Sequence, residues 1–231
     1  MIRVLGFDGD DTLWHSESRF EVTQGEFREL LRRHVPDADV GRRLAEMEMK
    51  NLNVYGYGVK SFTLSMLETA IELTEGRIPA SDLEVILGWG KGMLMAPTEL
   101  IDGVDETLRA LARKYDLMLI TKGDLFDQEG KLARSGLGEL FWGVDVVSEK
   151  NVETYEGVFR RRGIERERFV MVGNSLRSDI VPVVALGGRA VHIPYHVTWE
   201  HEHVPDSELP AAGWTRIASI TELPAALSNL G

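Results

Sequence analysis

The chain has 231 residues, enough for a well-buried core and for either one large domain or a core with a smaller inserted unit. Its 43% hydrophobic and 27% charged residues are typical of a globular protein and argue against disorder. The net charge of −11 argues against a general nucleic-acid binder, because phosphate-backbone binding needs clustered Lys and Arg. The absence of cysteine excludes disulfides and thiolate nucleophiles, and a cytoplasmic location is expected.

The first predicted element is a strand. Residues 1–7 form a short apolar run that meets Asp8 at once, which is too short for a signal peptide. No stretch approaches the length of about 18 apolar residues that a membrane-spanning helix needs, so no membrane partner is expected.

Four more short apolar runs follow, with helical periodicity between them. They lie at 117–120, 144–147, 169–172 and 190–193 and are rich in β-branched residues, which is typical of strands buried on both faces. Alternating strands and helices predict a parallel sheet. The expected fold class is therefore α/β, with a Rossmann-like sheet of about five strands and helices on both faces.

About a hundred residues separate the first strand from the second, far more than the roughly 30 of an ordinary strand-helix-strand unit. Residues 16–99 contain four apolar stripes with helical spacing, and turn signals separate these stripes. The sequence therefore predicts a small helical domain at 16–99, inserted into a core formed by residues 1–15 and 100–231.

Polar side chains follow each of the first four predicted strands. Because ligands bind beyond the carboxyl ends of parallel strands, we expect these side chains to share one pocket. In strand order they are Asp8, Asp10 and Thr12, then Thr121, Lys122 and Gly123, then Lys150, and finally Asn174 and Asp179.

These residue types suit phosphate chemistry. Packed carboxylates repel one another unless a cation stabilises them, and hard oxygen ligands favour Mg²⁺. One carboxylate can attack phosphorus to form an aspartyl-phosphate, while a second one, two residues on, transfers protons. Thr121 and Lys150 would bind the phosphoryl oxygens. Lys122 and Gly123 are assigned to the same phosphate-binding set.

At these residues the sequence strongly resembles the haloacid dehalogenase-like hydrolase superfamily. Its phosphatases share an Asp-x-Asp-x-Thr motif, then a Thr or Ser, a Lys and an acidic loop, in this order. The resemblance implies that Asp8 is the nucleophile and a metal ligand, and that Asp10 is the general acid/base, with a backbone carbonyl that also binds the metal. It places Asp179 in the metal site, and Asn174 stands there where the family usually has Asp, as a neutral and weaker ligand. It also implies that residues 16–99 are a helical cap of the C1 type.

The predicted function is Mg²⁺-dependent hydrolysis of a small phosphorylated metabolite, by a monomer or homodimer. One alternative is a 2-haloacid dehalogenase of the same superfamily, which attacks carbon and would not use Asp10. Another is a non-catalytic binding protein on the same fold, which only Asn174 favours. A zinc site among His192, His196, His201 and His203 is also conceivable, although such clusters are more often surface or packing residues.

Overall fold

The computed structural model describes residues 1–197 and 202–230. The chain divides into two compact units. The first consists of Met1–Glu17, Thr98–Lys122 and Gln128–Gly231, and the second of Ser18–Pro97 with Gly123–Asp127. The second unit thus contains a short segment that follows the second strand, in addition to the inserted helices.

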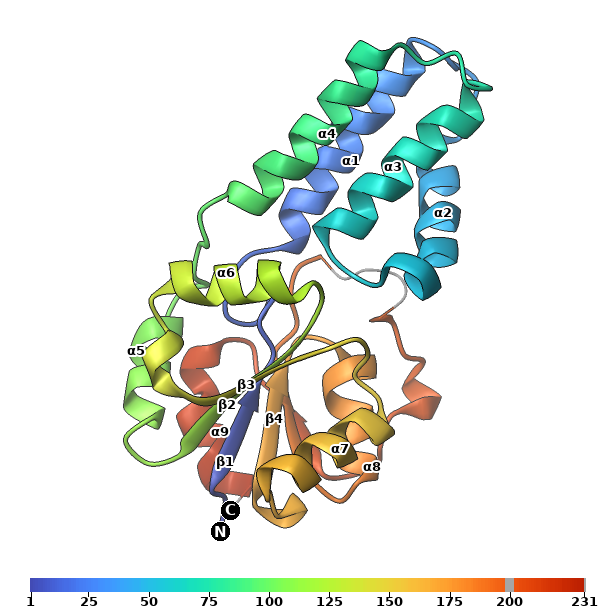
Figure 1. The fold of residues 1–231 in the computed structure, drawn as a ribbon. Coiled ribbons are helices and arrows are strands. Elements are labelled where there is room, and N and C mark those ends of the chain that lie inside the picture. The colour runs from blue at the N-terminus through green and yellow to red at the C-terminus, as the bar shows by residue number, and fades with distance from the viewer. Residues whose placement is uncertain (198–201, 231) are drawn as a thin grey trace. The chain divides into compact units, whose positions relative to one another are not determined.

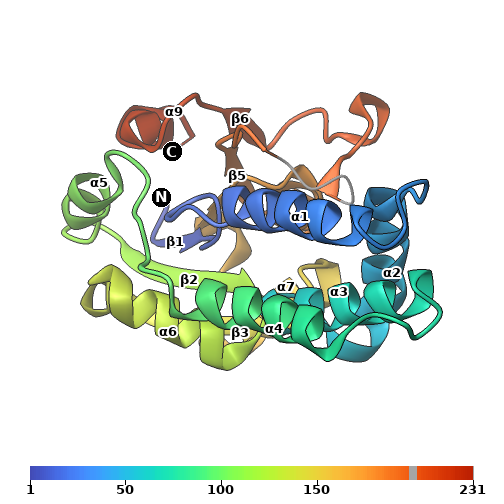
Figure 2. The same cartoon turned by 90° about the horizontal axis from the view of Figure 1, so that it is seen from above.

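The first unit is built on a parallel sheet, which within the described residues has six strands in the order β3-β2-β1-β4-β5-β6. Figure 2 shows β5 and β6 on one side of β1, and β2 and β3 on the other. The strands are β1 Val4–Phe7, β2 Asp116–Lys122, β3 Phe141–Val147, β4 Phe169–Gly173, β5 Arg189–His192 and β6 Trp214–Arg216. The predicted fold class is confirmed. The sheet has one strand more than expected, because β6 is only three residues long and leaves no readable pattern.

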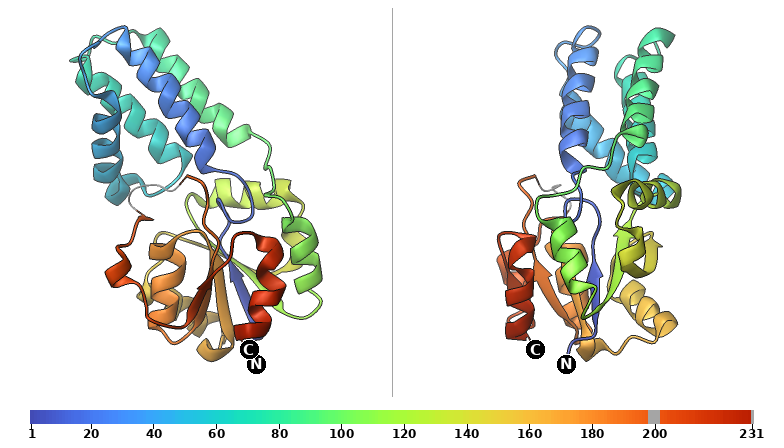
Figure 3. Two further views of the ribbon diagram at one scale, coloured as in Figure 1. Left: turned by 180° about the vertical axis from the view of Figure 1, so that it is seen from behind. Right: turned by 90° about the vertical axis from the view of Figure 1, so that its left-hand side faces the viewer.

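Alternate strand residues point to opposite faces of the sheet and bury two separate cores. Leu5 and Phe7 lie in the core covered by α5 and α9, while Val4 lies in the core covered by α7 and α8. The right-hand view of Figure 3 shows α5 and α9 on one side of the strands and α7 on the other. The helices are α5 Val104–Leu111, α6 Leu125–Ser135, α7 Val152–Arg162, α8 Val181–Ala185 and α9 Leu223–Leu230. Short helical turns lie at Gly138–Leu140, Arg166–Arg168, Leu176–Ile180, Asp206–Glu208 and Ile220–Glu222.

The second unit is a bundle of helices (Figure 1). It has a hydrophobic core of its own. The helices are α1 Glu17–Arg32, α2 Val40–Tyr55, α3 Val59–Leu73 and α4 Ala80–Met95. Phe27, Leu44, Met66 and Ile86 come from the four helices in turn and are buried together. In the described part of the chain, no helix combines the length and apolarity needed to cross a membrane.

The topology places the predicted site residues at one edge of the sheet. β1 lies between β2 and β4, and all the pairings are parallel. The residues that follow these strands therefore meet at the same edge. This is where the polar side chains after β1, β2, β3 and β4 come together.

Candidate active site

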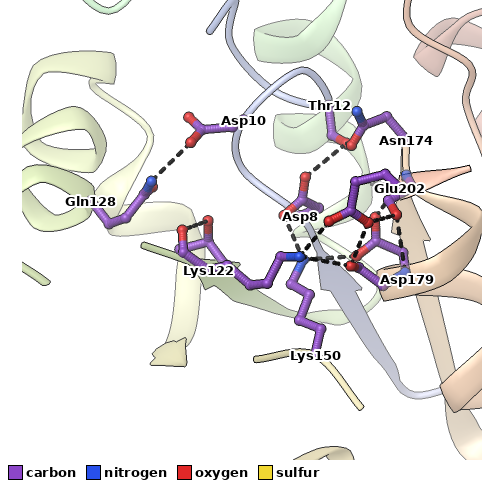
Figure 4. A network of polar contacts seen from close by, with 12 residues as sticks. Asp8, Asp10, Thr12, Lys122, Gln128, Lys150, Asn174, Asp179 and Glu202 are labelled. Atoms are coloured by element: carbon purple, nitrogen blue, oxygen red, sulfur yellow. Dashed lines mark hydrogen bonds and ion pairs between the residues drawn. The ribbon is translucent and has the colours of Figure 1, made fainter. Parts of the chain in front are cut away.

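The centre of the site is a buried ion triplet (Figure 4). Lys150 Nζ donates to Asp8 Oδ1 at 2.5 Å and to Asp179 Oδ1 at 2.7 Å. All three residues are buried, with exposed fractions of 3% for Lys150, 8% for Asp8 and 0% for Asp179. The structure thus brings together three side chains that the sequence predicted to meet, from the ends of β1, β3 and β4.

One ammonium shared by two buried carboxylates leaves a surplus negative charge. Burial disfavours the charged form of Lys150, yet the two carboxylates outweigh it and raise the lysine pKa. For Asp8, burial and the neighbouring Asp179 raise the pKa to about 7 against the opposing effect of Lys150. An additional cation at this position would stabilise both carboxylates in their charged form.

Asp179 lies in a turn with π-helical hydrogen bonding, Leu176–Ile180, an irregularity that often occurs at functional sites. The backbone N–H of Ser175 donates to Asp179 Oδ2 at 3.0 Å. A Cβ on Gly173 would lie 2.2 Å from the same oxygen. Only glycine at the end of β4 therefore leaves room for the carboxylate.

Asn174 and Asp8 share one hydroxyl. Thr12 Oγ1 lies 3.4 Å from Asp8 Oδ2 and 3.3 Å from Asn174 Oδ1. Since a hydroxyl has one proton to donate, it satisfies only one of these two oxygens at a time.

His192 holds the main chain of Asn174. Its Nε2 lies 2.9 Å from the Asn174 carbonyl oxygen, and Arg216 Nε donates to its Nδ1 at 3.2 Å. These two contacts fix the tautomer with the proton on Nε2. Each ring nitrogen of His192 therefore has a hydrogen-bond partner within the protein. His201, another member of the histidine cluster considered for zinc, lies outside the described residues.

The Asp10 carboxylate is turned away from Asp8 and toward α6. It accepts hydrogen bonds from Trp14 Nε1 at 2.7 Å, from Gln128 Nε2 at 2.9 Å and from Lys131 Nζ at 2.8 and 3.0 Å. Burial opposes ionisation, but Lys131 and these hydrogen bonds outweigh it and lower the Asp10 pKa. Sequence reasoning missed Gln128 and Lys131, whose only signal was their spacing of three residues, which places them on one face of α6.

The third carboxylate of the first motif has a structural role. Asp11 accepts the backbone N–H groups of Ser16 and Glu17 at 2.9 and 3.1 Å, where α1 begins. Its φ of 61° is unusual for a residue with a side chain and marks the sharp turn after Asp10. Asp11 thus orients the chain that carries Asp8 and Asp10.

Thr121 and Gly9 lie side by side at the ends of β2 and β1. A Cβ on Gly9 would lie 3.4 Å from Thr121 Oγ1 and 2.7 Å from the Trp14 ring. Glycine therefore lets the Asp8 loop approach Thr121, which is 1% exposed. Gly123, with a φ of 132°, begins the 123–127 segment of the second unit.

Lys122 is held by a residue that no motif indicated. Its Nζ donates to Glu202 Oε1 at 2.5 Å and to Ser178 Oγ at 2.9 Å. The other Glu202 oxygen accepts hydrogen bonds from the hydroxyls of Ser178, at 2.6 Å, and Ser175. Glu202 lies after β5, far from Lys122 in the sequence. Only the folding of the chain brings it to the site.

The Glu202 contacts predict a specific pH dependence of stability. Burial disfavours the Glu202 carboxylate, but Lys122 and the two serine hydroxyls lower its pKa to about 2 from 4.5. This stabilisation is fully present above pH 4.5 and is lost as the pH falls toward 2, and it amounts to at most about 3 kcal/mol. Urea unfolding of wild type and Glu202→Gln between pH 6 and 2.5 should show a free-energy difference that shrinks with acidity. A difference that is constant over this range would contradict the prediction.

The residues around Asp8 fit Mg²⁺ in charge and in atom type. Their available groups are the side-chain oxygens of Asp8, Asp179 and Asn174, and the triplet has one negative charge in excess. In the described part of the chain, no three His, Asp or Glu side chains form a ready metal cage. Mg²⁺ tolerates this arrangement, since it keeps several waters and needs only one or two carboxylates.

The sequence pattern of one family, haloacid dehalogenase-like hydrolase, matches residues 2–187. A crystal structure of a haloacid dehalogenase-like family hydrolase from Xanthomonas campestris is 43% identical, with a TM-score of 0.88 over 99% of this chain and 91% of that one. The HAD-hydrolase YfnB from Bacillus subtilis, solved with magnesium, is 20% identical, with a TM-score of 0.67 over 98% of each chain. A 2-haloacid dehalogenase from Pseudomonas syringae pv. Tomato shares the fold to a similar degree, with 20% identity and a TM-score of 0.65 over both full chains.

A glyceraldehyde 3-phosphate phosphatase from Methanothermobacter thermautotrophicus is 31% identical over 118 residues, which are 48% of this chain. These residues make up 52% of that protein, so the match spans about half of its length.

Proposed function

Because the chain belongs to the haloacid dehalogenase-like hydrolase family, we propose that it hydrolyses small phosphomonoesters through a covalent phosphate on Asp8. The observation that carries this proposal is the buried triplet, in which Lys150 holds Asp8 in place. Asp10, two residues on, is positioned separately by Lys131. The similarity to a phosphatase that acts on a small sugar phosphate supports the same substrate class.

In the first step, an Asp8 oxygen attacks phosphorus and the bond from phosphorus to the ester oxygen breaks. Lys150 and the Thr121 hydroxyl bind phosphoryl oxygens as charge spreads over them. Asp10 in its acid form gives a proton to the leaving oxygen, which departs as an alcohol. The contacts of Asp10 in the structure favour its ionised form, so it must gain a proton from solvent before this step, and rotation away from Lys131 would remove the main contact that opposes protonation.

In the second step, water attacks phosphorus and gives its proton to the ionised Asp10. The bond between Asp8 and phosphorus breaks, which returns the Asp8 carboxylate and releases inorganic phosphate. The contacts of Asp10 in the structure keep it ionised, as this step requires, and its carboxylate must turn from α6 toward Asp8 to reach the water.

Bound Mg²⁺ would supply the missing positive charge and orient the phosphate. Asp8, Asn174, Asp179 and the Asp10 carbonyl are the groups that would hold it. Lys150 Nζ contacts both carboxylates and offsets part of the charge of Asp8 and Asp179.

The test is phosphate release from p-nitrophenyl phosphate with Mg²⁺ and with a chelator. Release that depends on Mg²⁺ supports the proposal. Chloride release from 2-chloropropionate, without phosphate release and without a metal requirement, would show a dehalogenase instead. Inactivity in both assays, with retained binding of inorganic phosphate, would show a binding protein.

Asn174→Asp should lower the Mg²⁺ concentration needed for half-maximal activity. The change adds a negative charge beside Asp8, close to the position expected for the dication. The measurement is a Mg²⁺ titration of both proteins at fixed pH and ionic strength. If the two titration curves superimpose, Asn174 is not a metal ligand. Asp179 is then the only side chain of this loop that binds the metal.

A further inference from the structure

The Glu202 carboxylate joins two parts of the site that lie far apart in the sequence. It binds Lys122, which ends β2, and both Ser175 and Ser178, which follow β4. We call Lys122, Ser175, Ser178 and Glu202 the Glu202 clasp. Figure 4 shows Glu202 and Lys122 beside the ion triplet.

The clasp fixes the path of the Lys122 side chain. β1 lies between β2 and β4 in the sheet, so a lysine at the end of β2 that reaches Ser178 must pass across the end of β1. Asp8 is the first residue after β1. The Lys122 side chain therefore extends over the edge of the sheet where the phosphate would be attacked.

Glu202, rather than Glu149, is the acidic residue that holds Lys122. Glu149 Oε1 lies 3.5 Å from Lys122 Nζ and its side chain is 44% exposed, whereas Glu202 lies at 2.5 Å and is 12% exposed. Exposed ion pairs contribute little because water screens them, and a partly buried, hydrogen-bonded pair is screened much less. The Glu202 carboxylate also has two serine hydroxyls that fix its orientation.

We propose that Glu202 is a positioning residue, which acts through Lys122 to hold its ammonium across the end of β1 at the phosphate-binding side of the site. This inference rests on the proposed phosphatase activity. Without the carboxylate, Lys122 keeps its charge but loses its fixed position, and small misplacements at a reacting centre are costly.

The first test compares Mg²⁺-dependent hydrolysis of p-nitrophenyl phosphate by wild type, Glu202→Gln, Lys122→Met and the double variant. We expect Glu202→Gln to lower kcat by about tenfold or more, with KM changed by less than about threefold. In the Lys122→Met background, Glu202→Gln should change kcat by less than about twofold, because its effect passes through the lysine. Glu202→Asp keeps the charge on a shorter side chain and should lie between wild type and Glu202→Gln.

The second test measures the urea unfolding midpoint of the same proteins and does not depend on turnover. Lys122→Met leaves the partly buried Glu202 carboxylate without its cation and should lower the midpoint. Adding Glu202→Gln removes that unpaired charge and should restore part of the loss. Strictly additive losses would show that the two side chains are not coupled and would overturn the inference.

The matched control is Glu208→Gln, an exposed glutamate in the same connection between β5 and β6. It should behave as wild type in both tests. If wild type is active and Glu202→Gln has the same kinetics as Glu208→Gln, the positioning role of Glu202 is refuted while the proposed function stands. If wild type releases no phosphate with Mg²⁺, the proposed function fails and the inference fails with it.

Discussion

Asp8→Asn is expected to abolish phosphate release while the protein stays folded. An amide cannot form the covalent phosphate, so the proposed route has no first step. Asn keeps the size of Asp and an oxygen that can accept from Lys150, which also retains Asp179. Since burial raises the pKa of the Asp8 carboxyl, replacing it with a neutral group removes a cost of burial rather than adding one.

The measurement for Asp8→Asn is phosphate release at saturating substrate and Mg²⁺, with circular dichroism and urea unfolding as checks on the fold. Acid-quenched wild type mixed with substrate should contain a phosphorylated protein, and the variant should not. The control is Asp102→Asn, which changes an exposed carboxylate of the first unit and should keep full activity. Near-normal turnover by Asp8→Asn would refute the covalent mechanism.

Asp10→Asn is expected to lower kcat by about 10²-fold or more, because general acid/base catalysis contributes roughly 10² to 10⁴. The loss should depend on the leaving group. p-Nitrophenolate departs with little need for a proton, whereas an alkoxide needs one, so the loss should be larger for an alkyl phosphate such as glycerol phosphate. Binding of inorganic phosphate should survive, since the Asp10 carboxylate is turned toward α6 and away from Asp8.

The measurement for Asp10→Asn is kcat on both substrates, with phosphate affinity determined by calorimetry. An equal loss on both substrates would show that Asp10 is not the acid of the first step. An unchanged kcat on both would show that its network with Trp14, Gln128 and Lys131 is purely structural.

The sequence by itself determined the fold class and the residue types at the sheet edge. Buried parallel strands need near-continuous apolar runs, so β1 to β5 could be predicted from local composition. Parallel pairing then implied that residues after these strands share one edge, which predicted that Asp8, Lys150 and Asp179 lie together. β6 was missed because Trp214–Arg216 is too short to show a period.

The tertiary structure alone decided which partner each charged group has. Asp8 and Asp10 are two residues apart, yet Asp8 binds Lys150 while Asp10 binds Lys131 on α6. Burial raises the pKa of Asp8, which shares Lys150 with Asp179, whereas Lys131 and the other hydrogen bonds outweigh burial and lower the pKa of Asp10. Glu202 reaches Lys122 from 80 positions away in the sequence, and no local pattern encodes such a contact. Periodicity reports which face of an element is buried, but the charge balance of a site depends on side chains that only the folded chain brings into contact.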